Sequence, residues 1–161
     1  QRTGEVFLVP GPNDLADGRM RFEGFTPDDT EEAPIEESEV IVSGGYGMGN
    51  EANFHWLSRL AALLDGSVGV SRAAVERGWK PYPRQVGLSG KTVAPRLYIA
   101  CGISGAVQHL AGMQTAEHII AINMDPEAQI FQVADLSVVG DLFEVLPALV
   151  YKLENQQEDV A

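Results

Sequence analysis

From residue 39 onward, short apolar runs alternate with segments that have helical periodicity. The runs are EVIVSG at 39–44, SVGV at 67–70, LYIAC at 97–101, HIIAIN at 118–123 and LSVV at 136–139. Each run is too apolar to leave one face in water, which is typical of strands in a parallel sheet covered on both faces. The alternation predicts a doubly wound α/β fold of the nucleotide-binding type, with about five parallel strands and helices on both faces.

The segments between these runs supply the expected helices. Residues 50–64 place apolar side chains at the i, i+3, i+4 spacing of an amphipathic helix. Shorter helices are expected at 73–77 and 105–112, and a longer one at 141–153. Ser104 is the expected N-cap of the helix at 105–112, because serine accepts hydrogen bonds from the first free backbone N–H groups of a helix.

Residues 1–39 have a different amino-acid composition from the rest of the chain. They contain two β-like runs, Glu5–Val9 and Arg19–Phe25, followed by the acidic, proline-containing stretch TPDDTEEAPIEESE at 26–39. Few apolar residues and high charge are typical of a linker or solvated connection. We therefore expect residues 1–39 to be a β-containing segment and linker, the remnant of an upstream domain. Residues 40–153 are expected to form the nucleotide-binding domain, and 154–161 a frayed acidic tail.

Charge and cysteine content exclude several kinds of partner and site. A formal net charge of −12 disfavours nucleic acids and anionic membrane surfaces, which need clustered Lys and Arg. No apolar run reaches the roughly 20 residues of a spanning helix, so direct membrane insertion is not expected. Cys101 stands alone, which excludes an intramolecular disulfide and suits a reducing compartment such as the cytoplasm or an organelle matrix. His55, His109 and His118 lack metal-ligand spacing, so no metal site is predicted.

A glycine-rich loop, SGGYGMGN at 43–50, connects the first expected strand to its helix. Glycine lets the backbone approach a ligand closely, and a following helix N-terminus favours anions. The register is not GxGxxG, and the second strand is followed by Ser71–Arg72 where a dinucleotide fold has an acidic residue. A classical NAD domain is therefore disfavoured, and the loop is either a tight structural turn or a phosphate loop.

Three further strand-end segments carry polar groups that suit a ligand. Ser71–Arg72 offers a planar cation for a phosphate or an electron-rich ring; alternatively, the arginine is a surface residue paired with Glu76. The loop QVGLSGKTVAP at 85–95 offers backbone N–H groups and the Ser89 hydroxyl to a polar ring edge, or is a plain connection. His109 in GISGAVQHLAGM either reaches toward a heterocycle carbonyl or is a satisfied core histidine.

Five motifs in fixed order narrow these possibilities. They are SRAAV, GISGAVQHLAGM, AINMDPEA, IFQVAD and VGDLFEVLPAL. From residue 43 to 149 the chain resembles the C-terminal, FAD-binding domain of the electron transfer flavoprotein alpha subunit. The resemblance implies a FAD site formed by Tyr46, Ser71, Arg72, Val86, Gly87, Leu88, Ser89, Ser104, Gly105, Ala106, Val107, Gln108, His109, Asn123, Asp141 and Leu142.

The resemblance also implies what individual residues do. Ser89 stands where the family has a threonine hydroxyl near flavin N5, and His109 would lie beside the flavin O2 carbonyl. Arg72 would approach the isoalloxazine and favour its reduced, anionic forms, because a nearby positive charge stabilises developing negative charge. The other polar residues would contact the ribityl, diphosphate, sugar and adenosine parts, namely Ser104, Gly105, Asn123 and Asp141.

Two positions depart from the family's motifs. Tyr46 stands where family members usually carry arginine within GGRG, so one diphosphate or ribose contact is lost or replaced. The family's QVGQTG loop is QVGLSG in this chain. Leu88 therefore cannot supply an amide contact, and Ser89 lacks the methyl group that would fix its rotamer.

The function implied by the resemblance is electron carriage through bound FAD, not enzymatic catalysis. The electrons would come from a flavin dehydrogenase, such as an acyl-CoA dehydrogenase of fatty acid oxidation, and pass to a quinone reductase or another acceptor. The domain would work in a heterodimer with the electron transfer flavoprotein beta subunit. One alternative is a redox-silent nucleotide- or FAD-binding structural domain of related architecture; another is an assembly module that binds only its beta partner.

Overall fold

The computed structural model of the chain describes residues 34–158. The β-like runs predicted at Glu5–Val9 and Arg19–Phe25 lie outside the described residues, as do residues 159–161. Within the predicted linker, the helical turn η1 (Ile35–Glu37) buries the Ile35 side chain in the core. Ile35 of that acidic stretch is therefore packed against the domain, while Glu36 and Glu37 are exposed. The linker and the domain boundaries at 40 and 153 stay predictions.

Five parallel strands form one sheet in the order β2-β1-β3-β4-β5. The strands are β1 (Val40–Gly44), β2 (Ser67–Val70), β3 (Leu97–Cys101), β4 (His118–Asn123) and β5 (Leu136–Val139). All five follow the predicted apolar runs, and the doubly wound α/β fold is confirmed. Because β1 is flanked by β2 and β3, the winding direction reverses between β1 and β3. A ligand crevice is expected beyond the carboxyl ends of those two strands.

The helices follow the predicted segments, with changed ends. They are α1 (His55–Leu63), α2 (Arg72–Glu76), α3 (Val107–Leu110) and α4 (Leu142–Glu158), with single turns η2 (Tyr46–Met48), η3 (Glu51–Phe54), η4 (Tyr82–Arg84) and η5 (Gln129–Gln132). At the start of η3, Asn50 Oδ1 accepts a hydrogen bond from the Asn53 N–H at 3.1 Å. α4 continues to Glu158, so the part of the predicted frayed tail that the structure describes is helical. None of the helices within residues 34–158 is long and apolar enough to cross a membrane.

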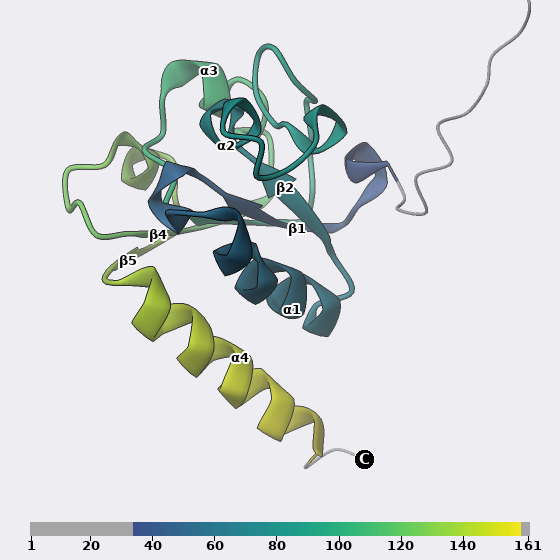
Figure 1. The fold of residues 1–161 in the computed structure, drawn as a ribbon, viewed down its shortest axis with the longest axis vertical. Helices are drawn as coiled ribbons and strands as arrows, with labels where there is room; N and C mark the ends of the chain where they lie inside the picture. Colours follow the sequence, from purple (N-terminus) through teal and green to yellow (C-terminus); the bar gives the residue numbers. More distant parts are fainter. Residues whose placement is uncertain (1–33, 159–161) are drawn as a thin grey trace, which may run out of the picture. The chain divides into compact units, whose positions relative to one another are not determined.

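Helices α1 and α4 lie together on one side of the sheet (Figure 1). Alternate strand side chains, including Val42 and Ile99, point into a core cluster with Leu57 and Leu60 of α1 and Leu146 of α4. Full burial of these side chains, at about 2 kcal/mol each, stabilises this layer. The helices predicted at 50–64 and 141–153 therefore share this layer, which the sequence analysis did not specify.

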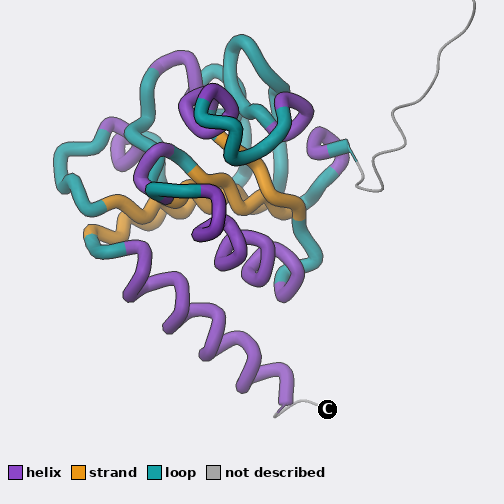
Figure 2. The backbone as a smooth tube through the Cα atoms, in the orientation of Figure 1, coloured by secondary structure: helices purple, strands orange, loops and turns teal. Residues whose placement is uncertain are grey.

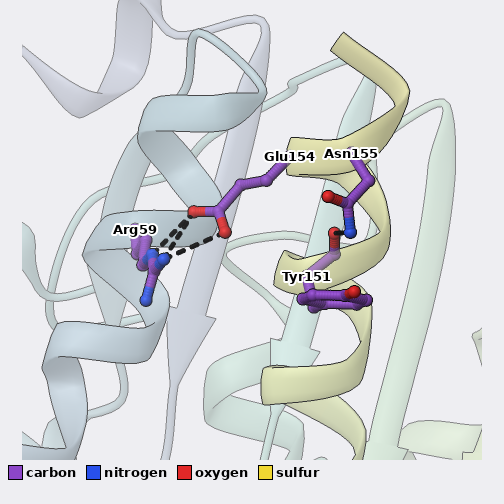
Figure 3. Close-up of polar contacts among 4 residues, drawn as sticks. All are labelled: Arg59, Tyr151, Glu154 and Asn155. Atoms are coloured by element: carbon purple, nitrogen blue, oxygen red, sulfur yellow. Dashed lines mark hydrogen bonds and ion pairs between the residues drawn. The ribbon is translucent and has the colours of Figure 1, made fainter. Parts of the chain in front are cut away.

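Near the end of α4 a polar contact adds to this packing (Figure 3). The Arg59 guanidinium donates two hydrogen bonds to the Glu154 carboxylate, at 2.8 and 2.9 Å. Half of the Arg59 side chain is exposed, so solvent screens the pair. We expect Glu154→Gln to lower the free energy of unfolding by less than about 1 kcal/mol. Urea unfolding at low and high salt checks this, and a loss above that size that is insensitive to salt would contradict it.

The opposite face of the sheet is covered differently. Tyr98, Ala100 and Ala121 pack there against loop and single-turn residues such as Val86 and Ile130. Figure 2 shows that most of the backbone on this side is loop. The loops bond to one another, as in the 2.8 Å hydrogen bond from the Val93 N–H to the Gly112 carbonyl, which satisfies backbone groups that no helix or strand pairs. Helix α3 also lies on this side (Figure 1), with Leu110 packed against the cluster, so both faces carry helices as predicted, but the helical part of this face is short.

Strand β5 is also more exposed than its apolar sequence predicts. Leu136 and Val139 are 53% and 57% exposed. β5 pairs only with β4 and is the last strand of the sheet order. An apolar run at a sheet edge cannot be distinguished by its sequence from one at the sheet centre, which explains the wrong prediction of full burial.

The helix predicted at 105–112 is reduced to the single turn of α3. Ser104 is not its N-cap: the capping position is Ala106, which makes no side-chain cap bond. Gly105 has φ +87°, and the Ser104 carbonyl accepts the Ile130 N–H at 3.0 Å. The chain turns at Gly105 to pack against η5, so helical backbone begins only after that turn.

Candidate functional site

A cavity of about 600 Å³ opens beyond the carboxyl ends of β1 and β3, at the expected crevice. Its walls come from the loops that follow β1, β2, β3 and β4. The lining residues are Tyr46, Gly47, Ser71, Arg72, Ala73, Gln85, Val86, Gly87, Leu88, Ser89, Gly102, Ile103, Ser104, Ala106, Gln108, His109, Asn123, Asp125 and Ala128. A cavity of this size and place suits an organic ligand of cofactor type.

Glycines bring the loops after β1 and β3 into direct backbone contact. The Gly45 N–H donates to the Cys101 carbonyl at 2.9 Å, and the Gly47 N–H donates to the Gly102 carbonyl at 3.0 Å. A Cβ atom at Gly45 would lie 2.3 Å from the Gly102 carbonyl oxygen. The glycine-rich loop is therefore a tight turn, and because Tyr46 and Gly47 of the same loop border the cavity, a role as a phosphate loop stays a prediction.

Most of the predicted site residues border this one cavity. Those that do are Tyr46, Ser71, Arg72, Val86, Gly87, Leu88, Ser89, Ser104, Ala106, Gln108, His109 and Asn123. The loop at 86–89 and the start of α3 are joined by a 2.7 Å hydrogen bond from the Leu88 N–H to the Gln108 carbonyl. The geometry therefore brings segments that are far apart in sequence to one ligand-sized space; their contacts with a cofactor stay a prediction.

Four predicted residues lie outside the cavity lining. Gly105 packs against η5, and Val107 has an exposed side chain that does not border the cavity. Asp141 Oδ1 accepts the Phe143 N–H at 2.8 Å at the start of α4. Leu142 is buried in the core beneath Gly102. Their contacts with FAD remain predictions, because none of the four residues borders the cavity.

Several lining residues were missed by the sequence analysis. They are Gly47, Ala73, Gln85, Gly102, Ile103, Asp125 and Ala128. Gly102 and Ile103 directly follow a predicted strand, so the strand-end rule was sufficient to find them. Gln85 begins the predicted loop at 85–95 but was not assigned to the site. Ala128 has no such signal, because only the folding of its loop brings it to the cavity.

Gln85 holds the Ser89 hydroxyl in place. Its side chain is 4% exposed, and its Nε2 donates to Ser89 Oγ at 3.0 Å. The Tyr82 hydroxyl donates to the Ser89 carbonyl at 2.8 Å. The hydrogen bond from Gln85 fixes the Ser89 rotamer without a methyl group. Because Ser89 Oγ accepts this bond, its own proton is left to donate to a ligand.

His109 is buried and uncharged. Its Nε2 is hydrogen-bonded to the Tyr98 hydroxyl at 3.0 Å, and its side chain is 7% exposed. Burial lowers the pKa of His109 to about 4, with a smaller opposing effect from the Val86 backbone. The Tyr98 partner keeps its proton, because burial raises its pKa. The hydrogen bond of Nε2 is that of a satisfied core histidine, which the sequence analysis gave as one of two alternatives. His109 also borders the cavity.

Arg72, the arginine that borders the cavity, forms only an exposed ion pair. Arg72 Nε lies 2.8 Å from Glu76 Oε1, and both side chains are largely exposed. This is the surface pair that the sequence analysis left as an alternative. Exposed pairs of this kind are worth less than about 1 kcal/mol, so the guanidinium can turn toward a ligand at little cost.

The cavity fits a flavin dinucleotide in the chemistry of its walls. Ser71 Oγ is a buried polar atom with no hydrogen-bond partner among the described residues, and Ser71 borders the cavity. A buried hydroxyl without a protein partner can accept a hydrogen bond from a bound polar group or donate one to it. Val86, Ile103 and Ala128 supply an apolar wall for a ring system.

Cys101, at the end of β3, does not line the cavity. Burial raises the pKa of its thiol to about 12, so the thiol stays protonated near pH 7.

Comparison with known proteins adds the decisive observation. The family model described as the electron transfer flavoprotein FAD-binding domain matches residues 34–114. The chain belongs to this family. The matched residues include β1, β2, β3 and the cavity loops at 46–47, 71–73, 85–89 and 102–109. The description of this family names FAD, which is the cofactor predicted from the sequence motifs.

Full-length relatives of the electron transfer flavoprotein family agree with this match. The chain is 45% identical over 154 residues to "Electron transfer flavoprotein subunit alpha" of Thermoanaerobacterium thermosaccharolyticum, covering 96% of this chain and 47% of the relative. It is 48% identical over 143 residues to the mitochondrial subunit alpha of Dictyostelium discoideum, covering 89% and 40%. It is 48% identical over 149 residues to "Protein FixB" of Azotobacter vinelandii, covering 92% and 41%. The chain thus spans less than half the length of these relatives.

Proposed function

We propose that the cavity beyond β1 and β3 binds FAD and that the chain is the FAD-binding domain of an electron transfer flavoprotein alpha subunit. It would then be an electron carrier and not an enzyme. The observation that carries the proposal is the coincidence of the family match with a cavity bordered by the loops that the match covers. Residues 40–153 would be the FAD-binding domain, between the N-terminal segment 1–39 and the tail 154–161.

Bound FAD would supply the one- and two-electron chemistry, while the protein supplies binding, orientation and electrostatics. Ser71 and Ser89 offer hydroxyl groups to polar atoms of the cofactor. Arg72 offers a positive charge that stabilises negative charge in the site. His109, neutral near pH 7, supports the cavity wall through Tyr98 and adds no charge of its own.

The partners of the carrier belong to the same proposal. We propose an electron transfer flavoprotein beta subunit that supplies part of the flavin's surroundings. A flavin dehydrogenase would be the donor, and a quinone reductase or another protein the acceptor. Exposed apolar side chains beside the cavity support a protein partner, namely Leu88, Val107 and Met124. The proposed compartment is the cytoplasm, or the mitochondrial matrix in a eukaryote.

A redox-silent structural domain is the competing function. The pairing of Arg72 with Glu76 and of His109 Nε2 with Tyr98 favours it, because these groups already have protein partners. His109 Nδ1, in contrast, is a buried atom without a hydrogen-bond partner among the described residues. The two functions differ in whether the protein tunes its cofactor. Removal of the Arg72 charge changes the reduction potential only in a carrier that holds this charge near the flavin.

The first test is the visible absorption spectrum of the purified protein, with acid release and identification of any cofactor. We expect flavin bands and released FAD. Redox titration should then give a lower potential for Arg72→Ala than for wild type, because loss of positive charge disfavours added electrons. Protein that stays colourless with added FAD and beta subunit would sink the proposal, and an unchanged potential would favour the redox-silent domain.

A further inference from the structure

Arg77 lies against a tyrosine that borders the cavity. Arg77 Nη2 donates to the Tyr46 hydroxyl at 3.1 Å, and its guanidinium carbon lies 4.7 Å from the centre of the Tyr46 ring. Tyr46 is 58% exposed and is part of the cavity lining. A hydrogen bond and a cation–π contact therefore hold the cation at the cavity rim.

The chain after α2 builds this arrangement. Gly78, at φ +73°, reverses the backbone, with its N–H donating to the Val75 carbonyl at 2.8 Å. Trp79 then stacks on Tyr46, with ring centres 6.2 Å apart and planes inclined by 23°. Trp79 in turn contacts the buried Phe54 ring at 6.0 Å. The exposed Tyr46 ring is thus anchored to the core and held in position for Arg77.

The charge of Arg77 is not compensated locally. Within residues 34–158, no carboxylate lies within ion-pair distance of its guanidinium. The charged side chains that border the cavity are Arg72 and Asp125, which have opposite signs, and Arg72 is paired with Glu76. Among the described residues, Arg77 is therefore a cation without an ion-pair partner, beside a cavity whose lining carries no net positive charge.

We propose that Arg77, together with Tyr46, binds the diphosphate of the dinucleotide cofactor; this rests on the proposed function. The Tyr46 oxygen accepts from Arg77, so its own proton is free to donate to a phosphate oxygen. The guanidinium offers further donors in a planar arrangement that suits phosphate. Arg77 thus supplies the cation that position 46, occupied by tyrosine, does not carry itself.

The test is titration of the apoprotein, with any beta subunit that co-purifies, with FAD followed by flavin fluorescence. We expect Arg77→Ala to raise the Kd about tenfold at low salt, the usual effect of losing one charge-assisted hydrogen bond. The difference should shrink at high salt, where exposed charges are screened. The double variant Tyr46→Arg/Arg77→Ala, which moves the guanidinium to position 46, should recover most of the affinity.

Arg96→Ala is the matched control, because Arg96 is an exposed arginine that pairs with Glu39 and does not border the cavity. It should bind FAD like wild type. An equal Kd for Arg77→Ala and Arg96→Ala at low salt would overturn this inference and leave the proposed function intact. A wild-type protein that does not bind FAD would overturn both.

Discussion

Replacement of Gly105 by alanine is expected to lower the free energy of unfolding by about 4 kcal/mol, the sum of a left-handed backbone cost and a steric overlap. Gly105 has φ +87°, which side chains other than glycine rarely adopt. An added Cβ atom would lie 2.1 Å from the Ile130 backbone nitrogen, so the loop and η5 must separate. Urea unfolding followed by circular dichroism measures the loss.

Gly78→Ala is the matched control for this prediction. Gly78 has a similar φ of +73°, but an added Cβ atom would meet no atom within 4 Å. Only the backbone cost then applies, about 1 kcal/mol. Equal losses for the two variants would show that the contact with η5 contributes nothing. Because Ser104 and Ala106 border the cavity, Gly105→Ala should also weaken FAD binding.

The second large effect is a loss of stability in acid that comes from His109. Its pKa is about 4 in the folded protein and 6.5 as the reference for the unfolded chain. The folded state therefore binds the proton less well. The contribution of neutral His109 to the free energy of unfolding is fully present above pH 6.5. It is lost as the pH falls toward 4, and the total loss is about 3 kcal/mol.

Unfolding of wild type and His109→Gln across this pH range measures the effect. Glutamine keeps a polar side chain but cannot be protonated, so its stability should fall less steeply between pH 6.5 and 4. The carboxylates titrate in both proteins and cancel in the difference. A His109→Gln slope equal to that of wild type would contradict the buried, neutral state of His109.

Both predictions concern the segment from the end of β3 through α3, which links stability to the site. Gly105 fixes where this loop leaves the sheet, and His109 ties α3 to Tyr98 on β3. The cavity residues between them depend on both contacts. A protein that loses either contact should lose cofactor affinity before it loses its sheet.

The amino-acid sequence by itself determined the five strands, the amphipathic α1 and the loops that would form the site. Short apolar runs such as LYIAC, separated by helical segments, indicate strands of a parallel sheet, and the spacing in 50–64 is a local property of a helix. Motifs such as GISGAVQHLAGM also indicate the family, because each motif is a continuous stretch of the chain. These features are readable because each depends on neighbouring residues alone.

The tertiary structure decided what depends on distant segments. β5 is exposed because the strand order puts it at the edge, and α3 is short because Gly105 meets η5. Gln85 orients Ser89, and Arg77 lies on Tyr46, which is 31 residues away in sequence. The local spacing of apolar residues indicates whether a segment forms a helix or a strand. Strand order and side-chain contacts depend on how whole segments pack together. The charge and hydrogen bonding of the site therefore became visible only in the folded chain.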